Sequence, residues 1–193
     1  MVAVNSTMLA IGTTAPEFSL LEPKTGQNVS LNDYQKATGY MVMFISNHCP
    51  YVIHLKEHLS QLCKEYKQQG IKFIAINSNN IAKYPDDAPD KMIVDAKKHS
   101  YTFPYLLDET QEIAQAYKAA CTPDFFLFNS DKKLVYRGQY DSTRPSSNEN
   151  PTGKDLKAAL DALLEGSSIP ENKQKPSIGC SIKWKPGNEP DTS

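Results

Sequence analysis

The stretch Met41-Val42-Met43-Phe44-Ile45-Ser46-Asn47-His48-Cys49-Pro50-Tyr51-Val52 decides the fold of this chain. Its first half is an apolar run of the length typical of a fully buried strand. A short turn follows, and a helical pattern begins at Pro50, a residue favoured at the first helical position because it has no N–H to leave unpaired. Cys49 therefore lies where a buried strand meets the N-terminus of a helix.

The position of Cys49 favours the thiolate form of its side chain, because the N–H groups and partial positive charge of a helix N-terminus stabilise negative charge. A thiolate is the nucleophile of sulfur chemistry. The alternative role for a lone cysteine is that of a small buried apolar residue. We expect Cys49 to be reactive and to be alkylated faster near neutral pH than the other cysteines.

The composition is that of a single globular domain. The chain has 193 residues, 39% of them hydrophobic and 22% charged, which is enough to bury a core. A net charge of −1 gives no electrostatic basis for binding nucleic acid or an anionic membrane, and no window approaches the roughly 20 apolar residues of a membrane span. Residues 1–10 lack the basic region of a signal peptide and the four cysteines are scattered, so we expect no disulfide framework and a reducing, cytoplasmic location.

Hydrophobic periodicity predicts strands that alternate with helices along the chain. Two short extended segments at 17–21 and 28–31 flank a turn, and the buried strand follows at 40–46. Further strands are expected at 71–77, 103–107, 124–128 and 133–138, and helices at 50–69, 89–98, 109–119 and 154–164. Residues 1–11 are expected to be a loose lead-in, 12–166 the domain, and 167–193 an irregular tail rich in Pro, Lys, Ser and Gly.

This order of elements predicts an α/β fold with a mixed central sheet covered by helices on both faces. Three motifs stand out: Gly12-x-x-Ala15-Pro16-x-Phe18-x-Leu20, Cys49-Pro50, and Thr122-Pro123 just before strand 124–128. On these motifs, about residues 10–166 resemble the thioredoxin-fold superfamily, in the branch shared by redoxin domains and peroxiredoxins of the alkyl hydroperoxide reductase and thiol-specific antioxidant type. Asn47-His48-Cys49-Pro50-Tyr51 and the tail Gly179-Cys180-Ser181-Ile182-Lys183-Trp184-Lys185 further resemble an uncharacterised peroxiredoxin-like group. The resemblance implies a thioredoxin-like fold with an N-terminal β-hairpin extension.

The residues around Cys49 match the family patterns only in part. Thioredoxins carry Cys-x-x-Cys with the first cysteine as nucleophile, whereas Cys49-Pro50-Tyr51-Val52 has valine at the second position, so a local dithiol is impossible. Peroxiredoxins carry Pro-x-x-x-Thr-x-x-Cys, and here Ser46 stands at the threonine position and Val42 at the proline position. The resemblance therefore favours the thioredoxin-type nucleophile over the peroxidatic cysteine.

The resemblance also implies a substrate groove beside Pro123. In thioredoxin folds a cis-proline faces the active-site cysteine and lets an incoming peptide backbone pair with its loop. Thr122, Pro123 and Pro50 would then line the substrate site. The alternative is an ordinary trans proline at the start of a strand.

A second thiol is needed to resolve a mixed disulfide on Cys49, and two cysteines compete for this role. Cys121 lies two residues before Pro123, so the fold brings it near Cys49. Cys180 lies in the tail and could swing over the same face. Cys63 is excluded, because it follows Cys49 on one helix by about 21 Å, and a disulfide needs Cα atoms within about 7 Å. We expect Cys121 to resolve Cys49, with Cys180 as the alternative.

Histidines near Cys49 supply the remaining candidate groups. His48 could accept the proton of the thiol or stabilise a thiolate as imidazolium, and the alternative is a solvent-exposed turn histidine. His54 and His58 have a spacing that could hold zinc, but no third ligand is evident. We expect neither a metal nor a cofactor.

Three functions are compatible with these residues. The leading hypothesis is a cytoplasmic thiol-disulfide oxidoreductase with Cys49 as nucleophile and a protein or low-molecular-weight thiol or disulfide as partner. The rival is an antioxidant peroxide reductase in which Cys49 is oxidised to sulfenic acid. The third is a non-catalytic interaction module, an alternative that Val52 keeps open because it removes the local dithiol.

Overall fold

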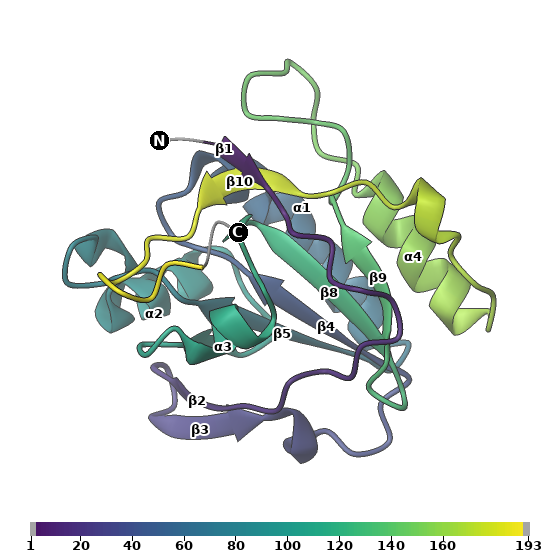
Figure 1. Cartoon of the computed structure of the whole chain (residues 1–193), viewed down its shortest axis with the longest axis horizontal. Helices are drawn as coiled ribbons and strands as arrows, with labels where there is room; N and C mark the ends of the chain where they lie inside the picture. The colour runs from purple at the N-terminus through teal and green to yellow at the C-terminus, as the bar shows by residue number, and fades with distance from the viewer. Residues whose placement is uncertain (1–2, 191–193) are drawn as a thin grey trace.

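A seven-stranded mixed sheet forms the centre of the molecule, seen in a computed structural model that describes residues 3–190 (Figure 1). Its order is β3-β2-β6-β5-β4-β8-β9. β4 pairs in parallel with β5 and antiparallel with β8, and β5 pairs in parallel with β6. The strands are β2 (Ser19–Glu22), β3 (Gln27–Ser30), β4 (Gly39–Phe44), β5 (Ile71–Asn77), β6 (Tyr105–Leu107), β8 (Asp124–Asn129) and β9 (Leu134–Gly138).

Helices cover both faces of this sheet, as the sequence predicts. One core cluster joins Met41, Met43 and Ile45 to apolar residues of α1 (Pro50–Lys67), α2 (Pro89–Lys98) and α4 (Lys154–Leu164). The other cluster joins Val42 and Phe44 to α3 (Glu112–Ala116) and to the N-terminal segment. Successive residues of β4 therefore point to opposite layers, and all six of its residues are buried. This double burial is the reason for the unbroken apolar run.

Several elements agree with the predicted ranges, and two, β6 and α3, are much shorter than predicted. β5 and α4 have the predicted bounds, and β2 and β3 form the expected antiparallel hairpin. α3 starts at Glu112 because Gln111 takes a left-handed φ of 68°, and it ends before Lys118, whose φ is 51°. β6 begins only after Pro104, which lacks the N–H that a ladder needs.

A second, three-stranded sheet corrects the predictions for the two chain ends. It has the order β1-β10-β7, with β1 (Ala3–Asn5), β10 (Ile178–Ser181) and β7 (Cys121–Thr122). Figure 1 shows β1 and β10 side by side. The lead-in 1–11 thus contributes a strand, and the tail 167–193 contains β10 as well as the short 3-10 helix at Glu171–Lys173. Segments this short carry no clear periodicity. Their strand structure depends on partners far away in the sequence.

Within residues 3–190, no helix combines the length and apolar character that crossing a membrane requires.

Candidate active site

Cys49 is the N-cap of α1, as the sequence predicts. Its backbone is extended (φ −68°, ψ 120°), Pro50 follows at the start of the helix, and the carbonyl of Cys49 accepts a hydrogen bond from the N–H of Ile53 at 2.9 Å. The N–H of Cys49 donates to Oγ of Ser46 at 3.2 Å. Ser46 thus fixes the corner at the end of β4, and the exposed Pro50 sets the direction of the helix.

The thiol of Cys49 is covered by other parts of the chain, which the sequence did not indicate. Its exposed fraction is 0%, and Sγ donates to the carbonyl oxygen of Thr122 at 3.0 Å. An alkylating reagent cannot reach a thiol in this position unless the cover moves. We therefore replace the expectation of fast alkylation with slow alkylation of the folded chain, limited by opening of the structure.

The cover includes Cys180, which the structure places against Cys49. β10 runs antiparallel to β7 with Cys180 opposite Thr122, whose carbonyl accepts the hydrogen bond of the Cys49 thiol. Burial and the neighbouring thiol of Cys49 raise the pKa of Cys180 to about 12, while the nearby Lys183 acts to lower it. The tail cysteine is thus held on a strand and does not swing freely.

Cys121 lies on the same small sheet but is oriented differently. It is opposite Ser181 in the register of β7 and β10, and neighbouring residues of a strand point to opposite faces. Its Sγ lies 3.6 Å from the carbonyl oxygen of Pro123. Burial, and then the charge of Asp124, hold the pKa of Cys121 well above its ordinary value. Cys121 is close to Cys49, but its thiol has another partner.

The groove expected beside Pro123 is occupied by the chain itself. The peptide bond between Thr122 and Pro123 is cis, as the resemblance implies. The backbone of Thr122, expected to pair with an incoming peptide, pairs with β10. Pro123 also lines a shallow cavity together with Tyr51, His54, Tyr140 and Arg144.

A buried carboxylate orients His48. Nδ1 of His48 lies 2.9 Å from Oδ2 of Asp87, which is fully buried. Burial acts to raise the pKa of Asp87, but hydrogen bonds from His48, Asn79 and the N–H of Asn47 together hold it below its ordinary value. A carboxylate that accepts several hydrogen bonds in this way stays ionised.

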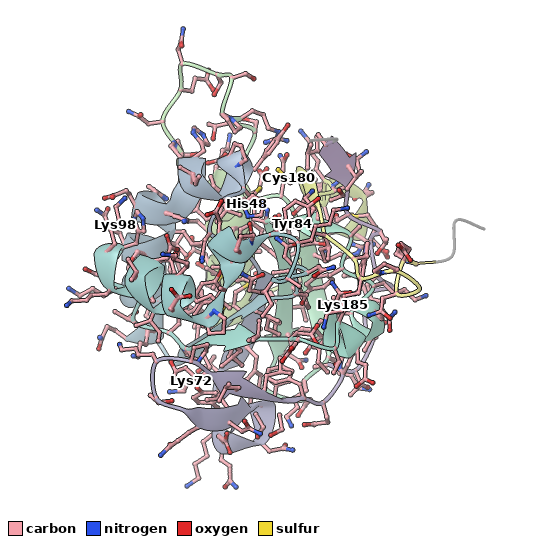
Figure 2. The ribbon with its side chains drawn as sticks, turned by 90° about the vertical axis from the view of Figure 1, so that its left-hand side faces the viewer. His48, Lys72, Tyr84, Lys98, Cys180 and Lys185 are labelled. Carbon is pink, nitrogen blue, oxygen red and sulfur yellow. The ribbon has the colours of Figure 1, made fainter. Side chains whose placement is uncertain are left out.

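The ring of Tyr84 holds the imidazole of His48, and Lys183 in turn lies over Tyr84. The ring of Tyr84 stacks on it, with centroids 5.7 Å apart and planes inclined by 2°, and Nζ of Lys183 lies 5.9 Å above the ring of Tyr84. Figure 2 shows His48, Tyr84 and Cys180 close together in the upper half of the view, remote from Lys72. His48 is therefore a fixed and only partly exposed residue, and not a mobile turn histidine.

A family model described as Redoxin matches residues 10–156. The chain belongs to the Redoxin family. Its thioredoxin-like fold agrees with a thioredoxin domain of a thiol-disulfide oxidoreductase from Bacteroides vulgatus, with a TM-score of 0.63 at 18% identity, covering 81% of this chain and 99% of that one. The family model confirms the redoxin branch expected from the motifs, and the structural match confirms the thioredoxin-like fold.

Closer relatives of this redoxin are uncharacterised. An uncharacterized conserved protein from Geobacillus kaustophilus has a TM-score of 0.93 and 52% identity, covering 97% of this chain and 98% of that one. A hypothetical protein from Sinorhizobium meliloti 1021 has a TM-score of 0.92 and 41% identity over 95% and 99% of the two chains. Among curated proteins, the thiol-disulfide oxidoreductase ResA of Geobacillus kaustophilus is 28% identical over 134 residues, which are 68% of this chain and 72% of the relative.

The sequence missed two carboxylates of the redoxin site. Asp87 reads as a helix cap before Pro89, but the N-cap of α2 is Ala88, and the carboxylate turns instead to Asn47 and His48. Asp124 reads as the first residue of a strand, yet it is fully buried beside Cys121. The sequence offered one signal for Asp124, a charged residue at the edge of an apolar strand. Burying a carboxylate without a partner is costly, so a residue in this position suggests a specific role.

The buried carboxyl of Asp124 predicts a pH-dependent stability. Burial raises its pKa to about 8, whereas an unfolded aspartate titrates near pH 4. The folded state therefore keeps a proton that the unfolded state releases, and stability is full below about pH 4 and falls as the pH rises to about 8. Asp124→Asn removes this loss. We expect the free energy of unfolding of the variant, relative to that of the wild type, to increase by more than about 1.4 kcal/mol from pH 5 to pH 8, the equivalent of one pKa unit. Urea unfolding at the two pH values measures this change.

Asp131→Asn, at an exposed position, is the matched control for Asp124→Asn and should show no such change. If the free energies of unfolding of Asp124→Asn and wild type differ by the same amount at both pH values, the raised pKa of Asp124 is contradicted.

The other candidate residues of the redoxin have structural partners. His54 contacts Oγ1 of Thr143 at 3.0 Å, and His58 contacts the hydroxyl of Tyr140. These contacts attach α1 to the loop after β9. Across the described part of the chain, no group of three metal-ligating side chains is found. Cys63 is buried in the core beside α1's other apolar residues, as predicted.

Proposed function

We propose that this redoxin is a thiol-disulfide oxidoreductase in which Cys49 is the nucleophile and Cys180 is the resolving thiol. The observation that carries the proposal is that Thr122 brings both cysteines together: Sγ of Cys49 lies 3.0 Å from its carbonyl oxygen, and Cys180 is held opposite Thr122 on β10. The name of the curated ResA relatives, thiol-disulfide oxidoreductase, supports the same chemistry. A protein or low-molecular-weight disulfide as substrate and a cytoplasmic location remain part of this proposal.

The reaction consists of two exchange steps. The thiolate of Cys49 attacks one sulfur of the substrate disulfide, which forms a mixed disulfide with Cys49 and releases the other sulfur as a thiolate. The thiolate of Cys180 then attacks Sγ of Cys49, which forms the Cys49–Cys180 disulfide and releases the second substrate thiolate. The substrate gains two electrons, and an external thiol restores them to the protein.

The pKa of Cys180 changes in the course of the reaction. While Cys49 carries charge, that charge and burial raise the pKa of Cys180, so the resolving thiol stays protonated. Once Cys49 is in a mixed disulfide it has no charge, and its contribution disappears. Lys183, which lowers the pKa of Cys180, then acts against burial alone. Resolution therefore becomes easier only after the first step.

His48 directly precedes the nucleophile in the sequence. The carboxylate of Asp87 lies 2.9 Å from its Nδ1 and fixes the orientation of the ring. We assign to His48 the proton of the Cys49 thiol, and to Asp87 the positioning of the ring.

The geometry favours Cys180 over Cys121, which reverses the order expected from the sequence. Cys180 is paired with Thr122, the residue whose carbonyl faces the Cys49 thiol, whereas the thiol of Cys121 is directed to the carbonyl of Pro123. Cys121 was favoured for its fixed place on the scaffold, but β10 gives Cys180 a fixed place too.

A single-turnover reaction tests the function. The reduced chain is mixed with one equivalent of glutathione disulfide, and released glutathione is counted. Two glutathione molecules per chain are expected, one from each step. One molecule, with the second bound to Cys49, would indicate a protein that depends on an external thiol. No reaction at Cys49 would refute the function and favour a non-catalytic interaction module.

Peroxide reduction is the second candidate and is expected to be slow. Sγ of Cys49 is covered and faces the carbonyl of Thr122, and Val42 replaces the proline of the peroxiredoxin motif. Stopped-flow oxidation by hydrogen peroxide should proceed at a rate comparable to that of free cysteine at the same pH. Rapid and saturating oxidation of Cys49 would contradict this expectation and promote the peroxide reductase.

A further inference from the structure

Gly179 occupies a position on β10 where no side chain fits. A Cβ added there would lie 2.0 Å from the carbonyl oxygen of Thr122 and 2.6 Å from its carbonyl carbon. Both are backbone atoms, so they cannot turn aside as the end of a side chain could. Gly179 is not among the glycines with a positive φ, so space and not backbone conformation requires it.

The carbonyl of Thr122 connects Gly179 to the nucleophile. Its oxygen accepts the hydrogen bond of the Cys49 thiol at 3.0 Å. The next residue of β10, Cys180, is opposite Thr122 and brings its thiol to Cys49. We call the backbone of Thr122 and Pro123, with the thiol of Cys49 beside it, the Thr122 strip.

Any extended chain that presents a sulfur to Cys49 along the Thr122 strip meets the same restriction. Side chains of a strand alternate between its faces, so the register that brings a cysteine thiol to Cys49 also fixes the preceding residue. The Cα of that preceding residue then lies against the carbonyl of Thr122, as Gly179 does. A Cβ on it would displace the strip or lift the incoming chain.

The small sheet that holds β10 is built from very short strands. β1 has three residues and β7 has two, and short sheets of this kind contribute little stability by themselves. Cys49 has no exposed surface while β10 is in place. An external disulfide must therefore meet a form of the protein in which β10 has left the Thr122 strip.

We propose that the Thr122 strip binds an extended segment of a partner protein in which glycine directly precedes a disulfide-bonded cysteine, and that β10 is the resident occupant which this segment replaces. This inference rests on the proposed function and names its substrate class. In the exchange, the thiolate of Cys49 attacks the cysteine sulfur of the segment, a Cys49–segment disulfide forms, and the former partner sulfur leaves as a thiolate. The return of β10 then brings Cys180 back for the second step.

Two peptides test the preference for glycine. One has the sequence of residues 176–183, and the other has alanine in place of the glycine. The cysteine of each is activated as a mixed disulfide with thionitrobenzoate. Each peptide is mixed with the full-length Cys180→Ser variant, which retains β10 but has no resolving thiol. Release of thionitrobenzoate gives the rate, and peptide mapping assigns the adduct to Cys49.

The glycine peptide is expected to react with Cys49 at least tenfold faster than the alanine peptide. Free glutathione, as the control nucleophile, should attack both peptides equally. Equal rates with Cys49 would overturn the inference while leaving the proposed function intact. Failure of Cys49 to react with either peptide or with the small thionitrobenzoate disulfide would overturn both.

The chain's own glycine gives an independent measurement. Gly179→Ala should push β10 off the Thr122 strip and raise the rate of iodoacetamide labelling at Cys49 at least tenfold. Gly187→Ala is the control for a strained backbone without a clash, since a Cβ at Gly187 meets no atom within 4 Å although its φ is 89°, and Cys49 in this variant should label at the wild-type rate. Circular dichroism confirms that each variant is folded. A folded Gly179→Ala chain with wild-type labelling of Cys49 would overturn the inference, and if this variant fails to fold, the peptide rates alone decide it.

Discussion

Replacing Cys49 by serine is expected to abolish disulfide exchange, with a loss of about 10³-fold or more, as follows from removal of a covalent nucleophile. A hydroxyl at this position is a far weaker nucleophile than a thiolate and cannot form a disulfide. The fold should remain, because serine is similar in size and its Oγ can still donate to the carbonyl of Thr122, the acceptor of the Cys49 thiol at 3.0 Å. The consumption of glutathione disulfide in the presence of an excess of dithiol measures the effect.

Cys63→Ala is the matched control for Cys49→Ser. Cys63 is buried in the core and lies on the same helix, so its loss should reduce stability without changing the rate of exchange in the folded protein. Activity of Cys49→Ser within tenfold of the wild type would contradict the assignment of the nucleophile.

Cys180→Ser is expected to separate the two steps of the reaction. The first step remains, so a mixed disulfide with glutathione forms on Cys49 and accumulates. The turnover rate should fall at least about 10²-fold, because a thiol held in place is replaced by a dissolved one that must find the site. Intact-protein mass spectrometry after mixing with glutathione disulfide detects the trapped adduct.

Cys121→Ser provides the comparison for Cys180→Ser. It should release two glutathione molecules and show no trapped adduct, because the thiol of Cys121 is directed to the carbonyl of Pro123. Accumulation of the adduct in Cys121→Ser, with normal turnover in Cys180→Ser, would exchange the roles of the two cysteines.

The elements predicted well are those whose signal is local. The apolar run of β4, the stripe of α1 and the alternation of strands and helices follow from periodicity within one element. The small sheet could not be predicted in this way. β1 and β10 are three and four residues long, and their pairing joins segments at opposite ends of the chain.

The sequence predicted that three cysteines lie near Pro123, but it did not predict how they are arranged. The motifs bring Cys49, Cys121, Cys180 and Pro123 to one place, but the roles of the cysteines depend on strand register. A shift of one residue in the pairing of β10 with β7 would turn Cys180 to the opposite face. Register is set here by contacts such as that of Gly179 with Thr122, and no pattern within the tail reports them.

The burial of Cys49 also depends on a contact between segments that are far apart in the sequence. A strand-to-helix corner predicts where the thiol lies and which charge the helix favours. It does not reveal a strand from 130 residues further along the chain that covers the thiol. The carboxylate of Asp87 was missed for a related reason, because its partners Asn47 and His48 lie 40 and 39 residues away.

Non-reducing peptide mapping of the full chain after one turnover with glutathione disulfide shows directly which thiol resolves the mixed disulfide on Cys49. Thr122 pairs with Cys180 and its carbonyl faces the thiol of Cys49, and a disulfide between these two cysteines is therefore the predicted product. The crosslink should form equally in Cys121→Ser. A Cys49–Cys121 disulfide in the wild-type chain, with no Cys49–Cys180 product, would contradict this assignment.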